Sequence, residues 1–368
     1  MLGEKSMPET AGRSITFAEA VREGLDQSMA QDSRVIVIGE GVPDPKAIFG
    51  TTAGLRQKYG ERRVFDMPLA ENGLTGACIG AAMCGLRPVM VHQRIDFALL
   101  AMDQLINNAA KWHYMFDGKT PVPLVVRMIV GRGWGQGPQH SQSLQAMFAQ
   151  SPGLKVVMPS TPHDAKGMLI AAIEDDNPVL FIEHRWLHGI SDDVPEGMYR
   201  VALNQARRLH EGDDVTIAAF SYMAIESLSA ARALLASMNI GADVLDMRSA
   251  SPLDSRSVVD SVRKTGRLVV ADTATRTGSI AGELISRVAE QAFDSLKARP
   301  VRIASPDHPA PTSHFMNEDF YPTARTIADE VLKLLGKTGE SASYEQLCSL
   351  TKRSGPHDTP NREFRGPF

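Results

Sequence analysis

The sequence predicts an α/β protein of two domains, each built on a mainly parallel β-sheet flanked by helices. In both halves of the chain, short apolar runs alternate with longer segments of helical periodicity, which is typical of parallel sheets covered on both faces. A polar, turn-rich stretch at 188–206 separates the two halves. The length of 368 residues agrees with this division, because a domain commonly holds roughly 100–200 residues.

The first half begins with a helix. Thr16 and Glu19 form a capping box, and apolar residues then recur at helical spacing as far as Met29. A later helix is capped by Thr161, with Pro162 at its first position. Apolar runs predict strands at 34–39, 62–66, 87–93, 122–128, 154–159 and 178–183, and further helices are predicted at 72–83 and 97–115.

The second half repeats the alternation. Strands are predicted at 214–220, 242–248, 266–273 and 300–305, and helices at 224–238, after Asp254, from Ser279 and up to about Leu335. The composition then turns to Ser, Pro, Gly and charged residues, which is typical of a loose tail. The predicted division is an N-terminal tail (1–14), a first domain (15–190), a linker (191–206), a second domain (207–336) and a polar tail (337–368).

Composition argues against some classes of partner. The net charge of -4 and the pI of about 6.2 offer no basic surface to nucleic acid or to an anionic membrane. No apolar run reaches the ~18 residues of a membrane span, and the N-terminus lacks the apolar core of a secretory signal. The three cysteines are an odd count, and Cys78 and Cys84 lie among small residues, where they are expected to pack as small apolar side chains. These features predict a reduced, cytoplasmic protein.

Motifs that carry chemistry are sparse. The chain has no P-loop and no CxxC pair, and the alternating glycines of Gly131–Gly137 lack GxGxxG spacing, so a surface loop is the simpler interpretation. Glu71 heads a helix of small residues, where the helix dipole alone accounts for a carboxylate. His140 follows the glycine loop, and a loop histidine is more often structural than catalytic, although it titrates near neutral pH. Taken singly, these residues define no function.

Several longer stretches together resemble the beta subunits of thiamin-diphosphate-dependent 2-oxo acid dehydrogenases. The likeness covers roughly residues 15–335 without large gaps. It rests on VIGEGV around Glu40, PLAENGLTGACIGAAMCGLRPV, DFALLAMDQLINNAAKWHYM, QHSQSLQAMFAQSPGLKVVMPSTPHDAKGML, DDNPVLFIEH and SPLD. The resemblance implies a pyrimidine-binding domain of the transketolase type, followed by a C-terminal domain of the transketolase type.

The resemblance implies roles for five residues. Glu71 matches the glutamate that hydrogen-bonds the aminopyrimidine ring of thiamin diphosphate and shares a proton with it. A dry pocket, which raises a carboxyl pKa, assists that task. Phe97 matches the aromatic residue stacked on the ring, and Glu40 and Gln93 match positions near the cofactor. His140 matches the active-site histidine linked to acyl transfer onto lipoyl-lysine.

The resemblance also concerns metals and partner subunits. Four positions match a structural potassium site of some members, largely through backbone carbonyls: Leu124, Ala172, Asp175 and Asn177. The family binds the cofactor diphosphate through Mg²⁺ and a GDG motif, and no GDG occurs here. A separate alpha subunit is therefore expected to supply the diphosphate and Mg²⁺ half of the site, most simply in an α2β2 heterotetramer.

The implied function is that of the beta subunit of a pyruvate-type dehydrogenase. Such an enzyme decarboxylates a 2-oxo acid oxidatively and passes the acyl group to a lipoyl-bearing acyltransferase. The nearest alternative is an acetoin dehydrogenase, or a transketolase-like half-enzyme that acts on a biosynthetic ketone or sugar donor. A silent scaffold is a third, and the joint presence of Glu71, Phe97 and His140 argues against it.

The sequence departs from the family pattern in three places. In the loop before His140, Arg132, Trp134 and Gln136 stand where the family usually has small residues, at the expected border of the substrate entrance. The stretch ADTATRTGSIAGEL is less acidic and less glycine-rich than its counterparts. The tail beyond about residue 337 has no counterpart in the family pattern.

Overall fold

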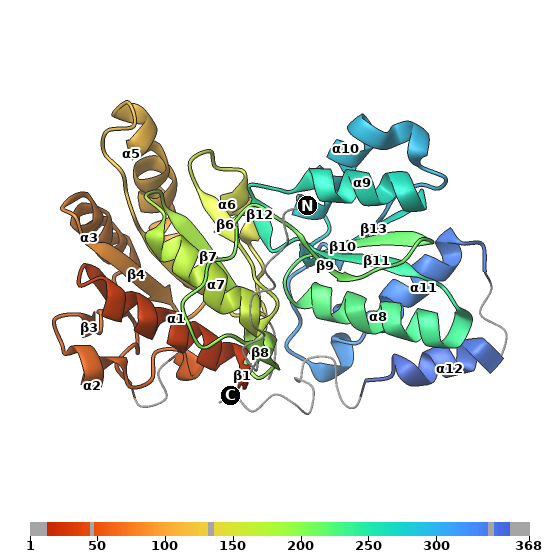
Figure 1. The fold of residues 1–368 in the computed structure, drawn as a ribbon, viewed down its shortest axis with the longest axis horizontal. Helices are drawn as coiled ribbons and strands as arrows, with labels where there is room; N and C mark the ends of the chain where they lie inside the picture. The colour runs from red at the N-terminus through yellow and green to blue at the C-terminus, as the bar shows by residue number, and fades with distance from the viewer. Residues whose placement is uncertain (1–12, 45–47, 132–135, 338–341, 354–368) are drawn as a thin grey trace, which may run out of the picture.

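The structure, a computed structural model, describes residues 13–44, 48–131, 136–337 and 342–353. Two large β-sheets lie side by side, each with helices on its faces (Figure 1). The fold class predicted from the alternation of strands and helices is therefore confirmed.

The first sheet has the strand order β12-β6-β7-β5-β4-β2-β3. Its strands are β2 (Val35–Gly39), β3 (Val64–Phe65), β4 (Arg87–His92), β5 (Val125–Val130), β6 (Lys155–Val157), β7 (Val179–His184) and β12 (Ser249–Ser251). All neighbours in this sheet are parallel except β12 and β6. Every residue of β5 and β7 is buried, which explains why these segments read as continuous apolar runs.

The second sheet has the order β14-β13-β10-β11-β9. Its strands are β9 (Arg207–His210), β10 (Val215–Ala219), β11 (Ala242–Asp246), β13 (Leu268–Thr275) and β14 (Val301–Ser305). Only β9 runs antiparallel to its neighbour. A separate antiparallel pair joins β1 (Arg13–Thr16) to β8 (Ser191–Val194), so the predicted linker at 191–206 begins with a strand.

Helices cover both faces of the sheets (Figure 1). In the first half they are α1 (Phe17–Gln31), α2 (Leu55–Tyr59), α3 (Glu71–Met83), α4 (Ile95–Ala98), α5 (Ala110–Met115), α6 (Gln145–Ala149) and α7 (Pro162–Glu174). In the second half they are α8 (Tyr222–Met238), α9 (Ser255–Thr265), α10 (Ile280–Ala292), α11 (Ala324–Leu334) and α12 (Ala342–Leu350). The capping box at Thr16 is present, and Thr161 and Asp254 cap α7 and α9 with their side chains.

Helices α1 and α7 pack on one face of the first sheet, and α3 and α4 lie over the other. The predicted helix at 97–115 is interrupted. It passes from α4 through a 3₁₀ turn at Leu99–Ala101 and a π turn at Gln104–Ala109 before it reaches α5. Such π turns are frequent near functional sites.

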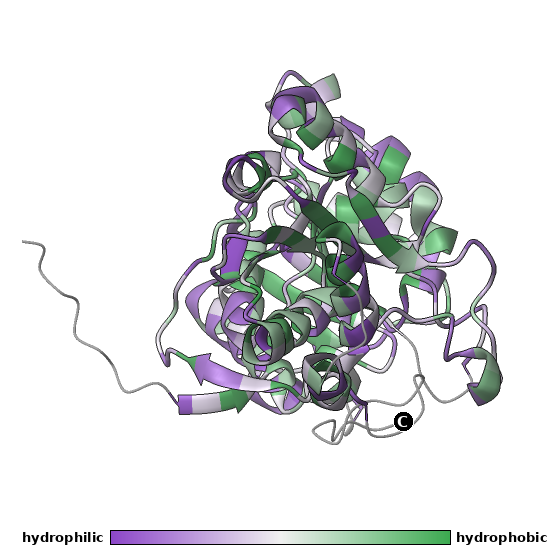
Figure 2. Cartoon of the chain, turned by 90° about the vertical axis from the view of Figure 1, so that its right-hand side faces the viewer, coloured by the Kyte–Doolittle hydropathy of each residue, from purple (hydrophilic) through white to green (hydrophobic). Residues whose placement is uncertain are grey.

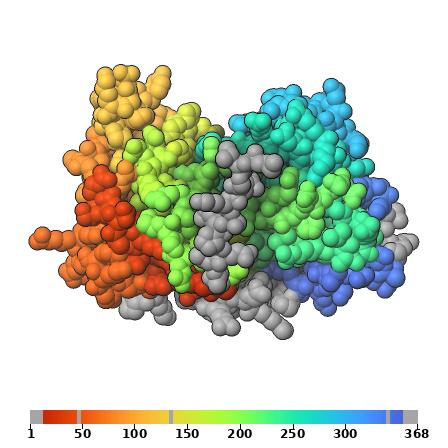
Figure 3. Space-filling model, in the orientation of Figure 1, coloured from red at the N-terminus to blue at the C-terminus, as the bar shows by residue number. Residues whose placement is uncertain are grey.

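The two halves share secondary structure. Strand β12 belongs to the second half of the chain, yet it pairs with β6 at the edge of the first sheet. The space-filling view shows two lobes with a notch between them at the top (Figure 3). In the side view, hydrophobic residues gather in the strands at the centre of the molecule (Figure 2). No helix among the described residues is long and apolar enough to cross a membrane.

The expectation of a loose polar tail from residue 337 needs correction. Helix α12 lies within that stretch, and Leu347 is completely buried in the core formed with α8 and α11. Tyr344 packs against the same cluster, and its hydroxyl accepts a hydrogen bond from Arg325 on α11. A short amphipathic segment is stabilised here by tertiary packing, which the polar composition of its surroundings concealed.

Candidate active site

The parallel strands of the first sheet bring their carboxyl ends to one edge, where ligands of open α/β sheets bind. Strands β2 and β4 end at Gly39 and His92, so Glu40 and Gln93 follow directly at this edge. The side-chain amide of Gln93 donates a hydrogen bond to the backbone oxygen of Glu40 at 3.2 Å. The structure thus places two of the predicted cofactor-binding residues side by side.

Glu71 is the first residue of α3, and its side chain is only 6 % exposed. The small residues that follow it have a different role. Gly73, Ala77 and Gly80 are exposed, and a Cβ atom built on Gly73 or Gly80 would meet no heavy atom within 4 Å. The outer face of α3 is therefore open to a close approach by another chain.

Glu40 and Glu71 form a carboxyl pair. Burial, the charge of Glu71 and a hydrogen bond between the two side chains raise the pKa of Glu40 above its ordinary value. The pair therefore holds a proton at pH values where an isolated glutamate has lost it. Glu40 Oε1 is buried and has no hydrogen-bond partner among the described residues. A carboxyl pair with a shared proton and an unsatisfied oxygen can exchange that proton with a nitrogen base.

Phe97 and His140 lie together although 43 residues separate them along the chain. Phe97 is on α4, His140 is on the loop after β5, and their rings meet edge to face with centroids 5.6 Å apart. Helix α4 is in turn tied to the start of α3, because the Asn72 side-chain amide donates to the backbone oxygen of Leu100 at 3.2 Å. The aromatic residue, the histidine and the carboxyl pair thus belong to one connected region.

Two charged residues in this region, Asp96 and Arg94, were not predicted from the sequence to belong to the site. Asp96 accepts a hydrogen bond from the side-chain amide of Gln142 at 2.7 Å. Arg94 is 5 % exposed and donates to the backbone oxygen of Gly131 at 3.2 Å and to the side-chain oxygen of Gln136. Burial is the main cause that lowers the pKa of Arg94, to about 10. The sequence did offer a signal for these residues, because Arg94 and Asp96 place two charges directly before Phe97.

The glycine loop is described only at its two ends. Gly131 has φ +115°, and its Cα lies against the ring of His184, so a side chain does not fit there. Arg132 and Trp134, which were expected to border the substrate entrance, lie outside the described residues.

His92, at the end of β4, was not singled out from the sequence either. Both of its ring nitrogens are buried without a hydrogen-bond partner among the described residues, and burial lowers its pKa to about 4, so it is neutral.

The four residues matched to a potassium site lie at the opposite edge of the first sheet. The backbone oxygen of Leu124 accepts from Val179, and that of Ala172 accepts from Asp175. The carboxylate of Asp175 accepts from the backbone of Asn177 at 2.9 Å and also pairs with the Lys155 ammonium. A lysine cation is thus already beside the only carboxylate of the four. The residues do cluster, and the assignment of an ion to them stays a prediction.

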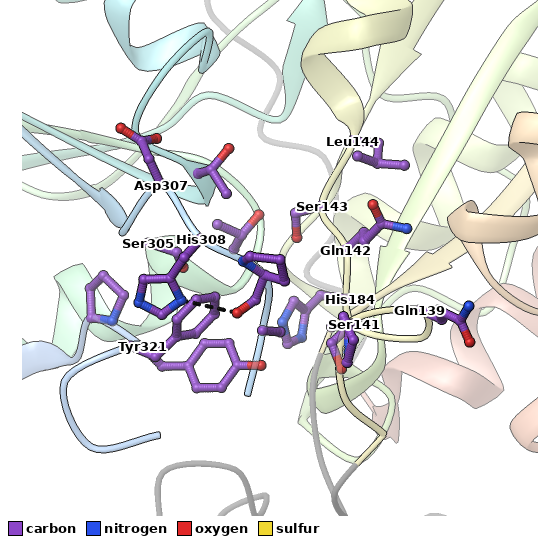
Figure 4. Close-up of a pocket in the computed structure, with 18 of the residues that line it drawn as sticks. Gln139, Ser141, Gln142, Ser143, Leu144, His184, Ser305, Asp307, His308 and Tyr321 are labelled. Carbon is purple, nitrogen blue, oxygen red and sulfur yellow. Dashed lines mark hydrogen bonds between the residues drawn. The ribbon is translucent and has the colours of Figure 1, made fainter. Parts of the chain in front are cut away.

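A cavity of about 570 Å³ lies between the two halves of the chain (Figure 4). Figure 4 shows Ser141 and Ser143 of the first half on one side and Ser305, His308 and Tyr321 of the second half on the other. The residues from Pro138 to Leu144 line this cavity, with the exception of His140. The ring of His140 contacts Phe97 instead.

The described residues fit the pyrimidine half of thiamin diphosphate. The Glu40–Glu71 carboxyl pair can share a proton with a ring nitrogen. The buried Oε1 of Glu40 has no hydrogen-bond partner among the described residues and can accept a hydrogen bond from a ligand. Phe97 offers an aromatic ring for stacking. No group of three or more acidic, histidine or cysteine side chains among the described residues could hold a metal ion.

Comparison with known proteins supports both domain assignments. Residues 13–189 match the transketolase pyrimidine-binding domain, and residues 204–327 match the transketolase C-terminal domain. The acetoin:2,6-dichlorophenolindophenol oxidoreductase subunit beta of Cupriavidus necator is 42% identical over 333 residues, which cover 88% of this chain and 98% of the relative.

Two further relatives agree. The pyruvate dehydrogenase E1 component subunit beta of Rickettsia bellii is 39% identical over 321 residues, which cover 87% of this chain and 98% of the relative. Among solved structures, the inactive beta4 tetramer of a split gene transketolase superposes with a TM-score of 0.70 at 24% identity, covering 88% of this chain and 98% of that one. The structural likeness supports the fold alone.

Proposed function

This chain belongs to the family of beta subunits of thiamin-diphosphate-dependent 2-oxo acid dehydrogenases, and from that premise we propose its reaction. Together with an alpha subunit, it catalyses the oxidative decarboxylation of a 2-oxo acid and the transfer of the acyl group to lipoyl-lysine. Thiamin diphosphate, when bound, supplies the electron sink for decarboxylation.

The observation that carries this proposal is the Glu40–Glu71 carboxyl pair. Glu71 would hold a proton at the ring nitrogen of the aminopyrimidine, and Glu40, whose pKa is raised by burial and by the charge of Glu71, lies beside it. Phe97 provides the surface on which the ring stacks. The buried position of Glu71 keeps water away from the shared proton.

His140 acts in the second half of the reaction. Its imidazole touches Phe97 from the side, so it borders the place where the acyl group is formed. Opening of the lipoyl disulfide requires a proton on a sulfur atom, and an imidazole is suited to deliver it near neutral pH. His140 therefore serves as the proton donor in acyl transfer, and a lipoyl-bearing acyltransferase is the expected acceptor protein.

The alpha subunit completes the cofactor site in an α2β2 assembly. The chain lacks the GDG motif for Mg²⁺ and diphosphate, so these groups are held by the partner. The surface around α3 supports such a contact, since Gly73 and Gly80 are open and several large apolar residues of the first half are exposed: Leu69, Leu100, Tyr114 and Met115. The free cysteines Cys78, Cys84 and Cys348 support a cytoplasmic enzyme.

Pyruvate is the first substrate to test, and acetoin is the second. The Rickettsia bellii relative is a pyruvate dehydrogenase subunit, while the Cupriavidus necator relative is named for acetoin. The glycine loop before His140 differs from the family pattern at Arg132 and Trp134, which supports a changed substrate.

The experiment is a substrate screen on the assembled enzyme. The chain is co-purified with its alpha subunit, loaded with thiamin diphosphate and Mg²⁺, and given pyruvate, 2-oxobutyrate, branched-chain 2-oxo acids or acetoin with an artificial oxidant. Turnover of one 2-oxo acid above the others supports the proposal, and turnover of acetoin alone selects the second candidate. An assembled, cofactor-loaded complex that turns over none of them overturns both.

A further inference from the structure

The loop from Pro138 to Leu144, here called the histidine loop, has little of its own structure. At its start the His140 N–H donates to the backbone oxygen of Gly137 over a long 3.5 Å, and at its end the Leu144 oxygen accepts from Met147 at 3.0 Å. Residues of the loop on either side of His140, from Pro138 to Leu144, line the cavity of about 570 Å³ (Figure 4). The orientation of His140 must therefore be fixed by contacts outside this cavity.

Helix α4 supplies that support through two consecutive residues. Asp96 Oδ1 accepts a hydrogen bond from Gln142 Nε2 at 2.7 Å, and Phe97 meets the ring of His140 with centroids 5.6 Å apart. Gln142 is two residues beyond His140, so the two contacts bracket the loop. A single ring contact leaves rotation about it free, whereas two contacts define an orientation.

The Asp96 side chain is half-buried. Its second oxygen, Oδ2, is buried and has no hydrogen-bond partner among the described residues. Burial raises the pKa of Asp96, and the hydrogen bond from Gln142 opposes that effect. A half-buried carboxylate with one buried, unsatisfied oxygen is costly, which indicates that its hydrogen bond to the loop has a use beyond stability.

We propose that Asp96 is a positioning residue for His140, which holds the histidine loop against α4 through Gln142 so that the imidazole stays beside the ring of Phe97. The proposal deepens the function assigned above, because it rests on His140 as the histidine of acyl transfer. A hydrogen bond to a charged acceptor is stronger than one between neutral groups, so the bond from Gln142 to the Asp96 carboxylate can hold the loop in place.

The structural part of the test is hydrogen exchange in the full chain without cofactor. Asp96→Ala and Gln142→Ala should each speed exchange of the His140 amide, whose N–H donates to the Gly137 oxygen, by roughly tenfold, the effect of losing one such bond. Asp96→Asn keeps an acceptor oxygen and should restore most of the protection. Asp103→Ala is the matched control, because Asp103 accepts a bond of the same 2.7 Å length from Asn107 without touching the loop. Unchanged exchange in both Asp96→Ala and Gln142→Ala overturns the proposal.

The functional part uses the assembled alpha–beta enzyme. Asp96→Ala should lower acyl transfer to a lipoyl domain by roughly ten- to a hundredfold, while decarboxylation with an artificial oxidant falls much less. The double variant with Gln142→Ala should be no worse than Asp96→Ala, since both changes break one bond. Fully additive losses, or equal losses in the two assays, overturn the role of Asp96. If the unaltered enzyme decarboxylates no 2-oxo acid, the proposed function fails, and the exchange experiment still decides whether Asp96 holds the loop.

Discussion

Glu71 is poorly explained as a simple helix-start carboxylate. A residue that served only the helix dipole would be exposed to water and distant from other acids. Instead its side chain is 6 % exposed and lies against Glu40, whose pKa it helps to raise. Two acidic side chains held together away from water cost folding free energy, and such arrangements concentrate at functional sites.

Glu71→Gln should therefore preserve the fold and the assembly but remove most turnover. Glutamine is nearly isosteric, yet it cannot share a proton with a ring nitrogen, and general acid–base effects amount to roughly 10²–10⁴-fold. The measurement is decarboxylation by the assembled alpha–beta enzyme, with size-exclusion chromatography as the control for assembly. Retention of more than about a third of the rate would remove this role from Glu71.

His140→Ala should separate two half-reactions. Acyl transfer to a lipoyl domain should fall by on the order of 10²-fold or more, because the sulfur loses its proton donor. Single-turnover decarboxylation with an artificial oxidant should fall much less. An equal drop in both rates would assign His140 to substrate binding, and no drop in either would leave it a structural residue.

The residues of the candidate site could be proposed from the sequence because long motifs agreed with a family pattern. Their mutual arrangement could not. The Glu40–Glu71 contact and the Asp96–Gln142 bond join residues that are 31 and 46 positions apart. Local periodicity carries no information about such pairs, which depend on how α3, α4 and the loop after β5 meet.

At the scale of elements, the long buried strands and the capped helices were predictable, since their patterns are local. Strands β5, β7 and β13 lie where apolar runs predicted them, and α7 and α9 begin at their predicted caps. Short edge strands β1, β8, β9 and β12 were missed, because few of their residues are apolar and partner strands from distant segments stabilise them.

Strands β5 and β7 are joined by a buried ion pair that no pattern indicated. Arg127 donates two hydrogen bonds to Glu183, at 2.6 and 2.9 Å, and both side chains are completely buried. His188 adds a third contact at 3.0 Å. Although burial opposes it, the charge of Arg127 and these hydrogen bonds lower the pKa of Glu183 to about 2.

Glu183→Gln should lower the free energy of unfolding by about 3–5 kcal/mol near neutral pH, because it leaves a buried guanidinium without its counter-charge. The pKa of Glu183 is depressed, so its contribution is present above about pH 4.5 and is lost as pH falls toward about 2. Denaturant unfolding measures the change. Glu174→Gln is the control, because the exposed Arg200–Glu174 pair should contribute less than about 1 kcal/mol. Equal effects of the two substitutions would contradict a dominant role for the buried pair.

For the whole molecule, the joint between the two halves is polar and sensitive to pH. Asp246, at the end of β11, is completely buried and accepts a hydrogen bond from Ser160 of the first half. Burial, together with the nearby charge of Asp164, raises the pKa of Asp246 to about 7. The folded protein therefore keeps this proton up to about pH 7, whereas the unfolded chain releases it near pH 3.8, so stability falls as pH rises across that interval.

Asp246→Asn should remove this loss. An asparagine can still accept from the backbone N–H of Arg248, and its amide can donate to the Ser160 hydroxyl, so both contacts of Asp246 have a replacement. Thermal unfolding of the variant and of the unaltered chain is compared at about pH 5 and about pH 8. The variant should gain relative stability at the higher pH. A difference in melting temperature that is the same at both values would show that Asp246 does not titrate in this interval.

We propose that this chain carries half of a cofactor site: Glu40, Glu71 and Phe97 would hold the pyrimidine, and an alpha subunit would hold the diphosphate. Calorimetric titration with thiamin diphosphate and Mg²⁺ tests it most directly, first on the chain alone and then on the co-purified alpha–beta complex. The single chain should show no tight binding, and the complex should bind thiamin diphosphate tightly in a Mg²⁺-dependent manner. Micromolar, Mg²⁺-dependent binding by the chain alone would contradict it.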